Sequence, residues 1–292
     1  MKKSEWAEYL DGFYIVDCAI KSKQIAYVLA VQDEPPEEDE DGHIDDEEWR
    51  LISWGPEVLG GDQSVICERH YNFRPVPALA VEGEPYNRLM LTDTNGNASL
   101  GDYGKDDVPA MEKMKTLWEK LYIMNGGYVY WRNSENNTWE RIDLPESLQE
   151  DNRASSGPRK YLLIDFDAFT PQDFYLLDNE GIVLYQEAGI WNETNLRDLG
   201  YRELDTYGIC CGPDGWVYIF GKDEKGGKIF QGKGDRWKVI WEDNFEIFHI
   251  DMVAYQDYVL ISNNIMFSKI QNGKVEHFKS PCTGSFLSVR DN

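Results

Sequence analysis

Short apolar runs separated by turn residues recur along the second half of the chain. Three segments share the order turn, β-rich run, turn, β-rich run: QDFYLLDNEGIVLYQ (172–186), DGWVYIFGKDEKGGKIFQ (214–231) and QDYVLISNNIMFSKI (256–270). Tyr175, Val217 and Val259 occupy equivalent places and follow one another at intervals of 42 residues. Another apolar run precedes each segment (161–166, 207–211, 248–255), and a fourth follows two of them (236–242, 274–278). Four short strands at this period predict β-propeller blades.

The first half fits the same scheme less regularly. Residues 12–20, 24–31 and 48–54 make one blade, 76–82 and 88–103 make part of a second, and 122–144 make a third. The unit lengths favour six blades, with five or seven as alternatives. A β-sandwich or two separate β domains would need no such period. We therefore predict an all-β chain, with residues 1–292 forming a single β-propeller domain.

One segment departs from the strand rhythm and predicts a short helix inserted at about residues 107–121. Its apolar residues recur at helical spacing, and they are Met111, Met114, Leu117, Trp118 and Leu121. Asp107 can cap the first turn, which holds Pro109. We expect this helix to pack on the propeller edge rather than to bind a partner.

The charge of the chain excludes several kinds of partner. The 29 basic and 53 acidic residues give a formal net charge of −24. Such a surface repels nucleic acid and anionic membranes and attracts basic proteins. The opening MKKSEWAEYLDGF has no apolar run of the signal-peptide type, and the five cysteines form no CxxC pair. These features predict a cytoplasmic protein.

The charge is concentrated in one acidic insertion, residues 33–48, where eleven of sixteen side chains are acidic and none is basic. The insertion is either a solvated charge run or a docking surface for a basic protein. Glu37, Asp39, Asp41 and Glu48 also approach the spacing of a calcium loop around Gly42. Glutamate at the first position, Pro35-Pro36 ahead and no flanking helix pair count against calcium. We predict no metal and no cofactor, with calcium as the alternative.

Catalytic motifs are lacking. No histidine pair has metal-ligand spacing, and the sequence contains no GxSxG elbow. Asp165 and Asp167 lie two apart in a predicted strand and share one face, a geometry that a glycosidase could use. Among 53 acidic residues, coincidence explains this spacing better. The prediction is a protein that is not an enzyme, and a propeller enzyme acting on carbohydrate is the alternative.

Binding through propeller loops is the favoured function, because loops from several blades form one broad surface on a rigid scaffold. Acids would steer a basic partner and aromatic residues would anchor it. The loops predicted to do so also contain Glu135 and Glu193. The predicted partner-binding residues are Asp33, Glu34, Glu37, Glu38, Asp39, Glu40, Asp41, Asp45, Asp46, Glu47, Glu48, Asp102, Tyr103, Asp106, Asp107, Trp131 and Trp191.

This acidic, cysteine-poor propeller resembles bacterial immunity proteins of contact-dependent growth inhibition systems. The resemblance lies in the blade units QDFYLLDNEGIVLYQ and YVYWRNSENNTWERIDL and in the heavy acidity. It implies one cognate basic toxin, bound 1:1, which could carry an EndoU-type nuclease domain. An acidic blocker can mimic the phosphate backbone that a basic nuclease groove accepts. A general scaffold for basic proteins remains the other non-enzymatic alternative.

Overall fold

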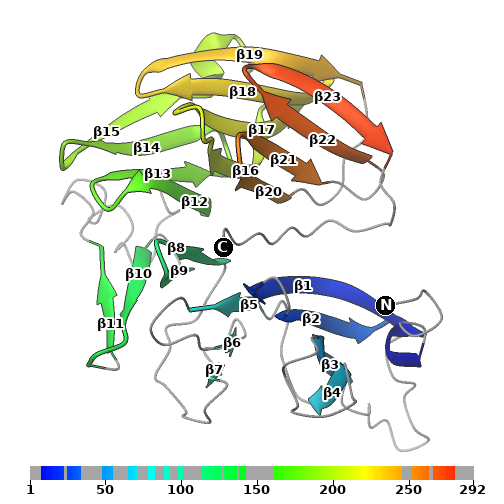
Figure 1. Cartoon of the computed structure of the whole chain (residues 1–292). Helices are drawn as coiled ribbons and strands as arrows, with labels where there is room; N and C mark the ends of the chain where they lie inside the picture. The colour runs from blue at the N-terminus through cyan, green and yellow to red at the C-terminus, as the bar shows by residue number, and fades with distance from the viewer. Residues whose placement is uncertain are drawn as a thin grey trace, which may run out of the picture. The chain divides into compact units, whose positions relative to one another are not determined.

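The computed structural model of the chain describes residues 8–22, 25–33, 48–54, 65–70, 78–82, 89–92, 98–100, 113–125, 128–136, 138–142, 161–244, 251–262 and 266–279. Nearly all of its regular structure is antiparallel β-sheet (Figure 1). By its internal contacts the chain divides into two compact units. Unit 1 comprises residues 1–122, 132–139 and 292, and unit 2 comprises 123–131 and 140–291.

The first two sheets confirm the strands predicted for the N-terminal third. The first sheet has the order β1-β2-β3-β4, with β1 (Phe13–Ser22), β2 (Ile25–Gln32), β3 (Trp49–Trp54) and β4 (Val65–His70). The second has three strands, β5 (Ala78–Val81), β6 (Leu89–Thr92) and β7 (Ala98–Leu100). In β2, alternation buries Tyr27, Leu29 and Val31 together in a core that also contains Trp49 and Leu51.

The third sheet corrects the helix predicted at about residues 107–121. Its order is β11-β10-β9-β8, with β8 (Lys113–Leu117), β9 (Lys120–Asn125), β10 (Tyr128–Asn133) and β11 (Thr138–Arg141). Residues 113–121 are therefore two strands joined by a tight turn, and residues 107–112 lie outside the described ranges. Trp118 and Glu119 both have positive φ, which suits a two-residue hairpin. Met114 and Leu121 are buried, so their helix-like spacing arose from two strands.

The last three sheets confirm the repeats of the second half. They are β12 (Leu163–Thr170), β13 (Asp173–Asp178), β14 (Ile182–Glu187) and β15 (Ile190–Asn195); β16 (Asp205–Cys211), β17 (Val217–Asp223), β18 (Gly226–Lys233) and β19 (Arg236–Asp243); and β20 (Asp251–Tyr255), β21 (Tyr258–Ser262), β22 (Met266–Gln271) and β23 (Lys274–Lys279). A short 3-10 helix, η1 (Leu196–Leu199), follows β15. The segment GKDEKGGK contains the hairpin turn between β17 and β18.

The sheets are propeller blades because their first strands are neighbours. In unit 1, β1 contacts β5 and β5 contacts β8; in unit 2, β12 contacts β16 and β16 contacts β20. Each first strand is therefore the inner strand of a blade whose strands follow outward in order. The β-propeller class is confirmed. The sequence favoured six blades and left five open; the described residues form five four-stranded blades and one three-stranded sheet.

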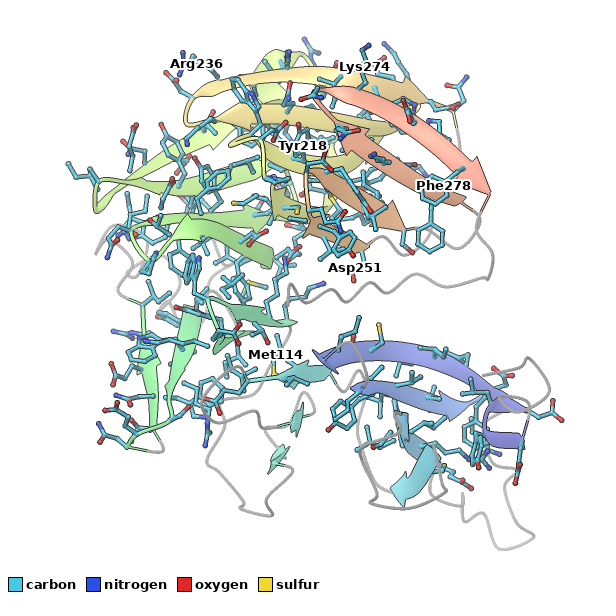
Figure 2. The ribbon with its side chains drawn as sticks, in the orientation of Figure 1. Met114, Tyr218, Arg236, Asp251, Lys274 and Phe278 are labelled. Atoms are coloured by element: carbon cyan, nitrogen blue, oxygen red, sulfur yellow. The ribbon has the colours of Figure 1, made fainter. Side chains whose placement is uncertain are left out.

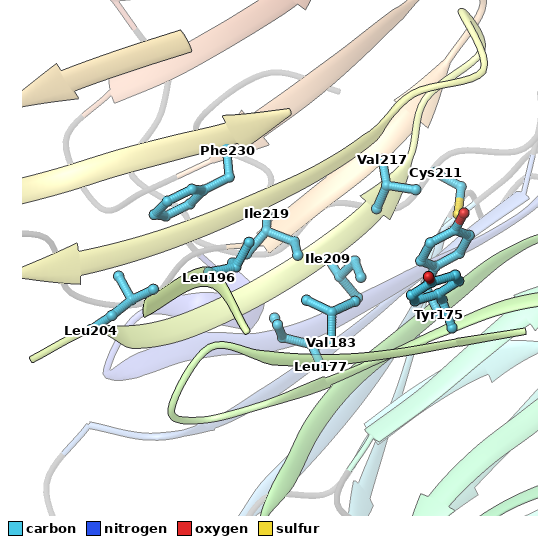
Figure 3. Packing of buried hydrophobic residues seen from close by; sticks show 11 residues of the cluster. Tyr175, Leu177, Val183, Leu196, Leu204, Ile209, Cys211, Val217, Ile219 and Phe230 are labelled. Atoms are coloured by element: carbon cyan, nitrogen blue, oxygen red, sulfur yellow. The ribbon is translucent and has the colours of Figure 1, made fainter. Parts of the chain in front are cut away.

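Apolar layers between blades hold unit 2 together. One layer joins blade β12–β15 to blade β16–β19 through side chains such as Tyr175, Leu177, Ile209 and Cys211 (Figure 3). A second layer joins blade β16–β19 to blade β20–β23 and contains Cys210. The adjacent cysteines thus face opposite sides of β16, as alternation in a strand predicts.

Candidate partner-binding surface

The turns of unit 2 fall into two sets at opposite ends of its blades. Because consecutive strands are antiparallel, the first and third turns of a blade share one end, and the second turn shares the other end with the connections between blades. The turn face comprises residues 170–173, 187–190, 212–216, 233–236, 255–258 and 271–274. The connection face comprises residues 161–162, 178–182, 195–205, 222–226, 242–244 and 251, together with Tyr207 near the start of β16.

Neighbouring blades have the same orientation. The backbone N–H of Ile209 donates to the Asp165 carboxylate (3.0 Å), and the N–H of Cys211 donates to the Asp167 carboxylate (2.8 Å). In both strands the second partner lies two residues after the first. β12 and β16 therefore run in the same direction, so each face is continuous across the two blades. Figure 2 agrees, with Arg236 and Lys274 at the turn ends of their strands and Asp251 and Phe278 at the other ends.

The connection between β15 and β16 is held firmly in place. Asn195 caps η1 by accepting a hydrogen bond from the Arg197 N–H (2.9 Å), and Gly200 ends the helix in the left-handed conformation. The Arg197 guanidinium pairs with Glu180 at 3.0 Å and also donates to the Leu204 carbonyl. The segment is thus tied to the β13–β14 turn of its own blade.

The same connection is tied to the next blade through Tyr201. Its hydroxyl donates to Glu242 at 2.9 Å, and its ring packs on Phe230 and lies 5.2 Å from the Lys228 ammonium. Burial, with the Glu242 hydrogen bond second, raises the pKa of Tyr201 to about 12. The phenol therefore stays protonated and keeps donating at neutral pH.

Lys228 is buried (1% exposed) beneath this tyrosine and pairs with Asp223 at 2.9 Å. Burial acts to raise the pKa of Asp223, but the hydrogen bonds from Lys228 and from the Lys225 N–H, together with the charges of both lysines, outweigh burial and the net shift is downward. Asp223 is therefore ionised at neutral pH and lies in ion-pair distance of the buried Lys228. This charge is compensated inside the blade, so it offers little attraction to a partner.

The connection face carries more acidic than basic side chains. Its acids are Asp178, Glu180, Asp198, Glu203, Asp205, Asp223, Glu224, Glu242, Asp243 and Asp251, against the bases Arg197, Arg202, Lys222 and Lys225. Asp198, Glu203, Asp205 and Glu224 are exposed. Exposed apolar residues accompany them: Leu162 (45%), Leu199 (44%) and Tyr207 (39%). This face therefore combines acidic side chains, which attract a basic protein, with exposed apolar side chains, which can contact it.

The turn face is closer to neutral. It carries Asp173, Glu187, Asp214, Asp235 and Asp257 with Lys233, Arg236 and Lys274. Lys233 lies 3.9 Å from Asp173 and 4.7 Å from the Phe169 ring, so these charges are partly matched locally. Ile190 (68%) and Trp216 (39%) are its exposed apolar residues. The connection face is thus the better candidate for a basic partner.

The structure locates some of the residues that were predicted to lie in partner-binding loops. Trp131 lies in β10 and Trp191 in β15, both half-buried in strands, so the prediction that they lie in loops was wrong. The prediction was also wrong for Glu193, which lies in β15 and accepts a hydrogen bond from Tyr161, whereas Glu135 lies in an exposed turn. β10 is an interior strand of its sheet, and β15 is an edge strand.

The acidic insertion is described only at its two ends. Asp33 is exposed and its N–H donates to the Gly12 carbonyl, while Glu48 pairs with Arg50 at 2.8 Å. Residues outside the described ranges are Glu34, Glu37, Glu38, Glu40, Asp39, Asp41, Asp45, Asp46, Glu47, Asp102, Tyr103, Asp106 and Asp107. In its blade, the insertion joins β2 to β3. It is therefore the same kind of connection as the acidic β13–β14 and β17–β18 turns.

The described residues show how Asp165 and Asp167 are used. Each carboxylate accepts the N–H of the following residue and an N–H of β16, and Asp165 is only 3% exposed. Both side chains are therefore ties between blades. Elsewhere in the described ranges, no cluster of three or more metal-ligating side chains forms, and Glu48 of the calcium alternative already has its arginine partner.

Sequence reasoning missed the residues of the connection face. Leu162, Leu199, Glu203, Asp205, Tyr207 and Glu224 do not stand out in the sequence, because acids and single apolar residues occur throughout it. The order of the strands within each blade is the feature that would have indicated these residues. Once strands are numbered within a blade, alternate turns must lie at the same end.

Comparison with solved structures places the fold among β-propellers. Virginiamycin B lyase from Staphylococcus aureus, a catalytically inactive form with quinupristin, matches with a TM-score of 0.62 at 10% identity, over 95% of this chain and 90% of that one. BamB from Moraxella catarrhalis matches with 0.50 at 11% identity, over 95% and 78%. YCF48 bound to a D1 peptide matches with 0.51 at 12% identity, over 92% and 94%.

These likenesses define the class of protein as a β-propeller and go no further than the fold. No protein-family model matches the chain, and no curated protein matches it. Within the described ranges, no helix has the length and apolar character needed to cross a membrane.

Proposed function

We propose that the protein is a cytoplasmic immunity protein that binds and neutralises one cognate basic toxin, and that this toxin is a nuclease. The observation that supports the proposal most is the connection face, which carries exposed acids together with the exposed apolar residues Leu162, Leu199 and Tyr207. Acidic side chains attract a basic protein before contact, and buried apolar contacts then hold it. A net charge of −24 adds long-range attraction.

The fixed position of the connection between β15 and β16 supports this proposal. Binding loses affinity when a flexible loop must be ordered, and pre-organised surfaces avoid that cost. Residues 196–204 are tied to one blade through Arg197 and to the next through Tyr201. Asp198, Leu199 and Glu203 are therefore presented from a fixed backbone.

The first prediction concerns the partner itself. A tagged pulldown from the native bacterial lysate is expected to return one stoichiometric basic protein, encoded beside this chain. Expressed alone, that protein should be toxic, and co-expression with this chain should restore growth. Many unrelated basic partners would instead support a general scaffold, and no stoichiometric partner would overturn the proposal.

The second prediction concerns association in salt. The on-rate for the partner should fall about tenfold or more as ionic strength rises from roughly 0.05 to 0.5 M. The double variant Glu203→Gln/Glu224→Gln should slow association severalfold at low salt and little at high salt, as measured by stopped-flow fluorescence. Deletion of residues 34–47 tests the acidic insertion in the same assay.

The matched control is Glu187→Gln/Asp235→Asn, which removes the same charge from exposed positions of the turn face. Its on-rate should stay close to that of the wild type once the change in net charge is allowed for. Equal slowing by both double variants would show that the connection face has no special part in steering.

A further inference from the structure

Tyr207 is an exposed aromatic residue in the inner strand of its blade. In the pairing of β16 with β17, Thr206 faces Gly221 and Gly208 faces Phe220, so Tyr207 is an extra residue in a β-bulge. A bulge interrupts the alternation of a strand and redirects one side chain. Here the tyrosine remains 39% exposed, while its neighbours Thr206 and Ile209 are buried.

The surroundings of Tyr207 are acidic. Asp205 is exposed two residues earlier at the start of the same strand. Burial, followed by the negative charge of Asp205, raises the pKa of the Tyr207 phenol. A Cβ on Gly208 would lie 3.6 Å from the Asp165 carboxylate and 3.7 Å from the Met252 sulfur, so β16 is closely flanked here by β12 and β20. Asp251 begins β20 beside Met252.

An exposed aromatic ring next to carboxylates matches the chemistry of a basic side chain. A guanidinium or ammonium group is attracted to the face of a tyrosine ring and pairs with a nearby carboxylate. Arginine also stacks well on aromatic rings because its cation is planar and weakly hydrated. Tyrosine is in addition a residue type that often dominates protein interfaces.

We propose that Tyr207 and Asp205 form the anchor for one arginine or lysine side chain of the bound basic protein, with the ring beneath the cation and the carboxylate beside it. This anchor rests on the proposed function and names the chemistry of the contact. The acids farther out on the connection face steer the partner, and the anchor slows its release.

A fluorescein-labelled oligoarginine peptide tests the anchor without knowledge of the natural partner, by fluorescence anisotropy. Tyr207→Leu should weaken peptide binding about three- to fivefold, because the ring contributes a modest cation–π attraction. Tyr207→Phe keeps the ring and should bind about as well as the wild type. Asp205→Asn should weaken binding and reduce its dependence on salt.

Trp216→Leu is the matched control, since Trp216 has the same exposed fraction (39%) on the turn face. It should leave peptide affinity unchanged. Equal affinity of Tyr207→Leu and the wild type, or equal losses in Tyr207→Leu and Trp216→Leu, would overturn the anchor.

The two proposals fail in different ways. If Tyr207→Leu neutralises a cognate toxin with unchanged off-rate, the anchor is wrong and the immunity function stands. If the peptide depends on Tyr207 but the lysate yields no toxic partner, the anchor stands and the immunity function is wrong.

Discussion

Gly226→Ala is expected to destabilise the protein by about 3–5 kcal/mol, because a side chain there meets backbone. Gly226 begins β18 with φ of +120°, a conformation that residues with a Cβ rarely adopt. A Cβ would lie 2.8 Å from the Asn244 Cα and closer still to the Asp243 carbonyl oxygen. Backbone of the paired strand β19 cannot move aside without breaking its hydrogen bonds to β18.

Urea unfolding followed by tryptophan fluorescence measures this effect. Gly215→Ala is the control, because Gly215 also has positive φ (+81°) but nothing within 4 Å of a Cβ. It should cost only about 1–2 kcal/mol, the conformational penalty alone. If both variants lost the same stability, close approach of β19 at Gly226 would contribute nothing.

Asp165→Asn is expected to lower the free energy of unfolding by about 2–4 kcal/mol. The buried carboxylate accepts N–H groups from Phe166 (2.8 Å) and Ile209 (3.0 Å), and the second bond joins two blades. An asparagine has one acceptor oxygen, so its amide nitrogen would face a backbone donor. One buried N–H would lose its partner.

Asp235→Asn provides the comparison, since Asp235 is exposed in a turn and should change stability by less than about 0.5 kcal/mol. If Asp165→Asn and the wild type were equally stable in urea unfolding, the hydrogen bonds of the Asp165 carboxylate would not stabilise the contact between the two blades. The same experiment concerns the alternative of an enzyme that acts on carbohydrate. If Asp165→Asn lost both stability and turnover, the loss of turnover would be explained by unfolding and not by a catalytic role of Asp165.

Strand repeats were predictable because they depend on local sequence. Tyr175, Val217 and Val259 recur at one interval, and the strands containing them occupy the same place in three blades. The opposite facing of Cys210 and Cys211 also followed from alternation alone. Such features need no knowledge of which distant residues meet.

The helix prediction failed for a physical reason. Met114, Leu117, Trp118 and Leu121 have helical spacing, but two strands of a tight hairpin can produce the same spacing of apolar residues. Positive φ at Trp118 and Glu119 reverses the chain between them. Pairing with β10 supplied the hydrogen bonds that a helix would have made internally, so tertiary context prevailed over local pattern.

By itself, the sequence determined the all-β propeller class and the acidic character, since periodic burial and charge are properties of the chain alone. Only the tertiary structure decided how particular residues are used. It left Tyr207 exposed at a bulge, made Asp165 and Asp167 hydrogen-bond acceptors between blades, and brought Glu203, Asp205 and Glu224 to one face. These outcomes depend on pairing and packing between residues that are far apart in the chain, which no local pattern specifies.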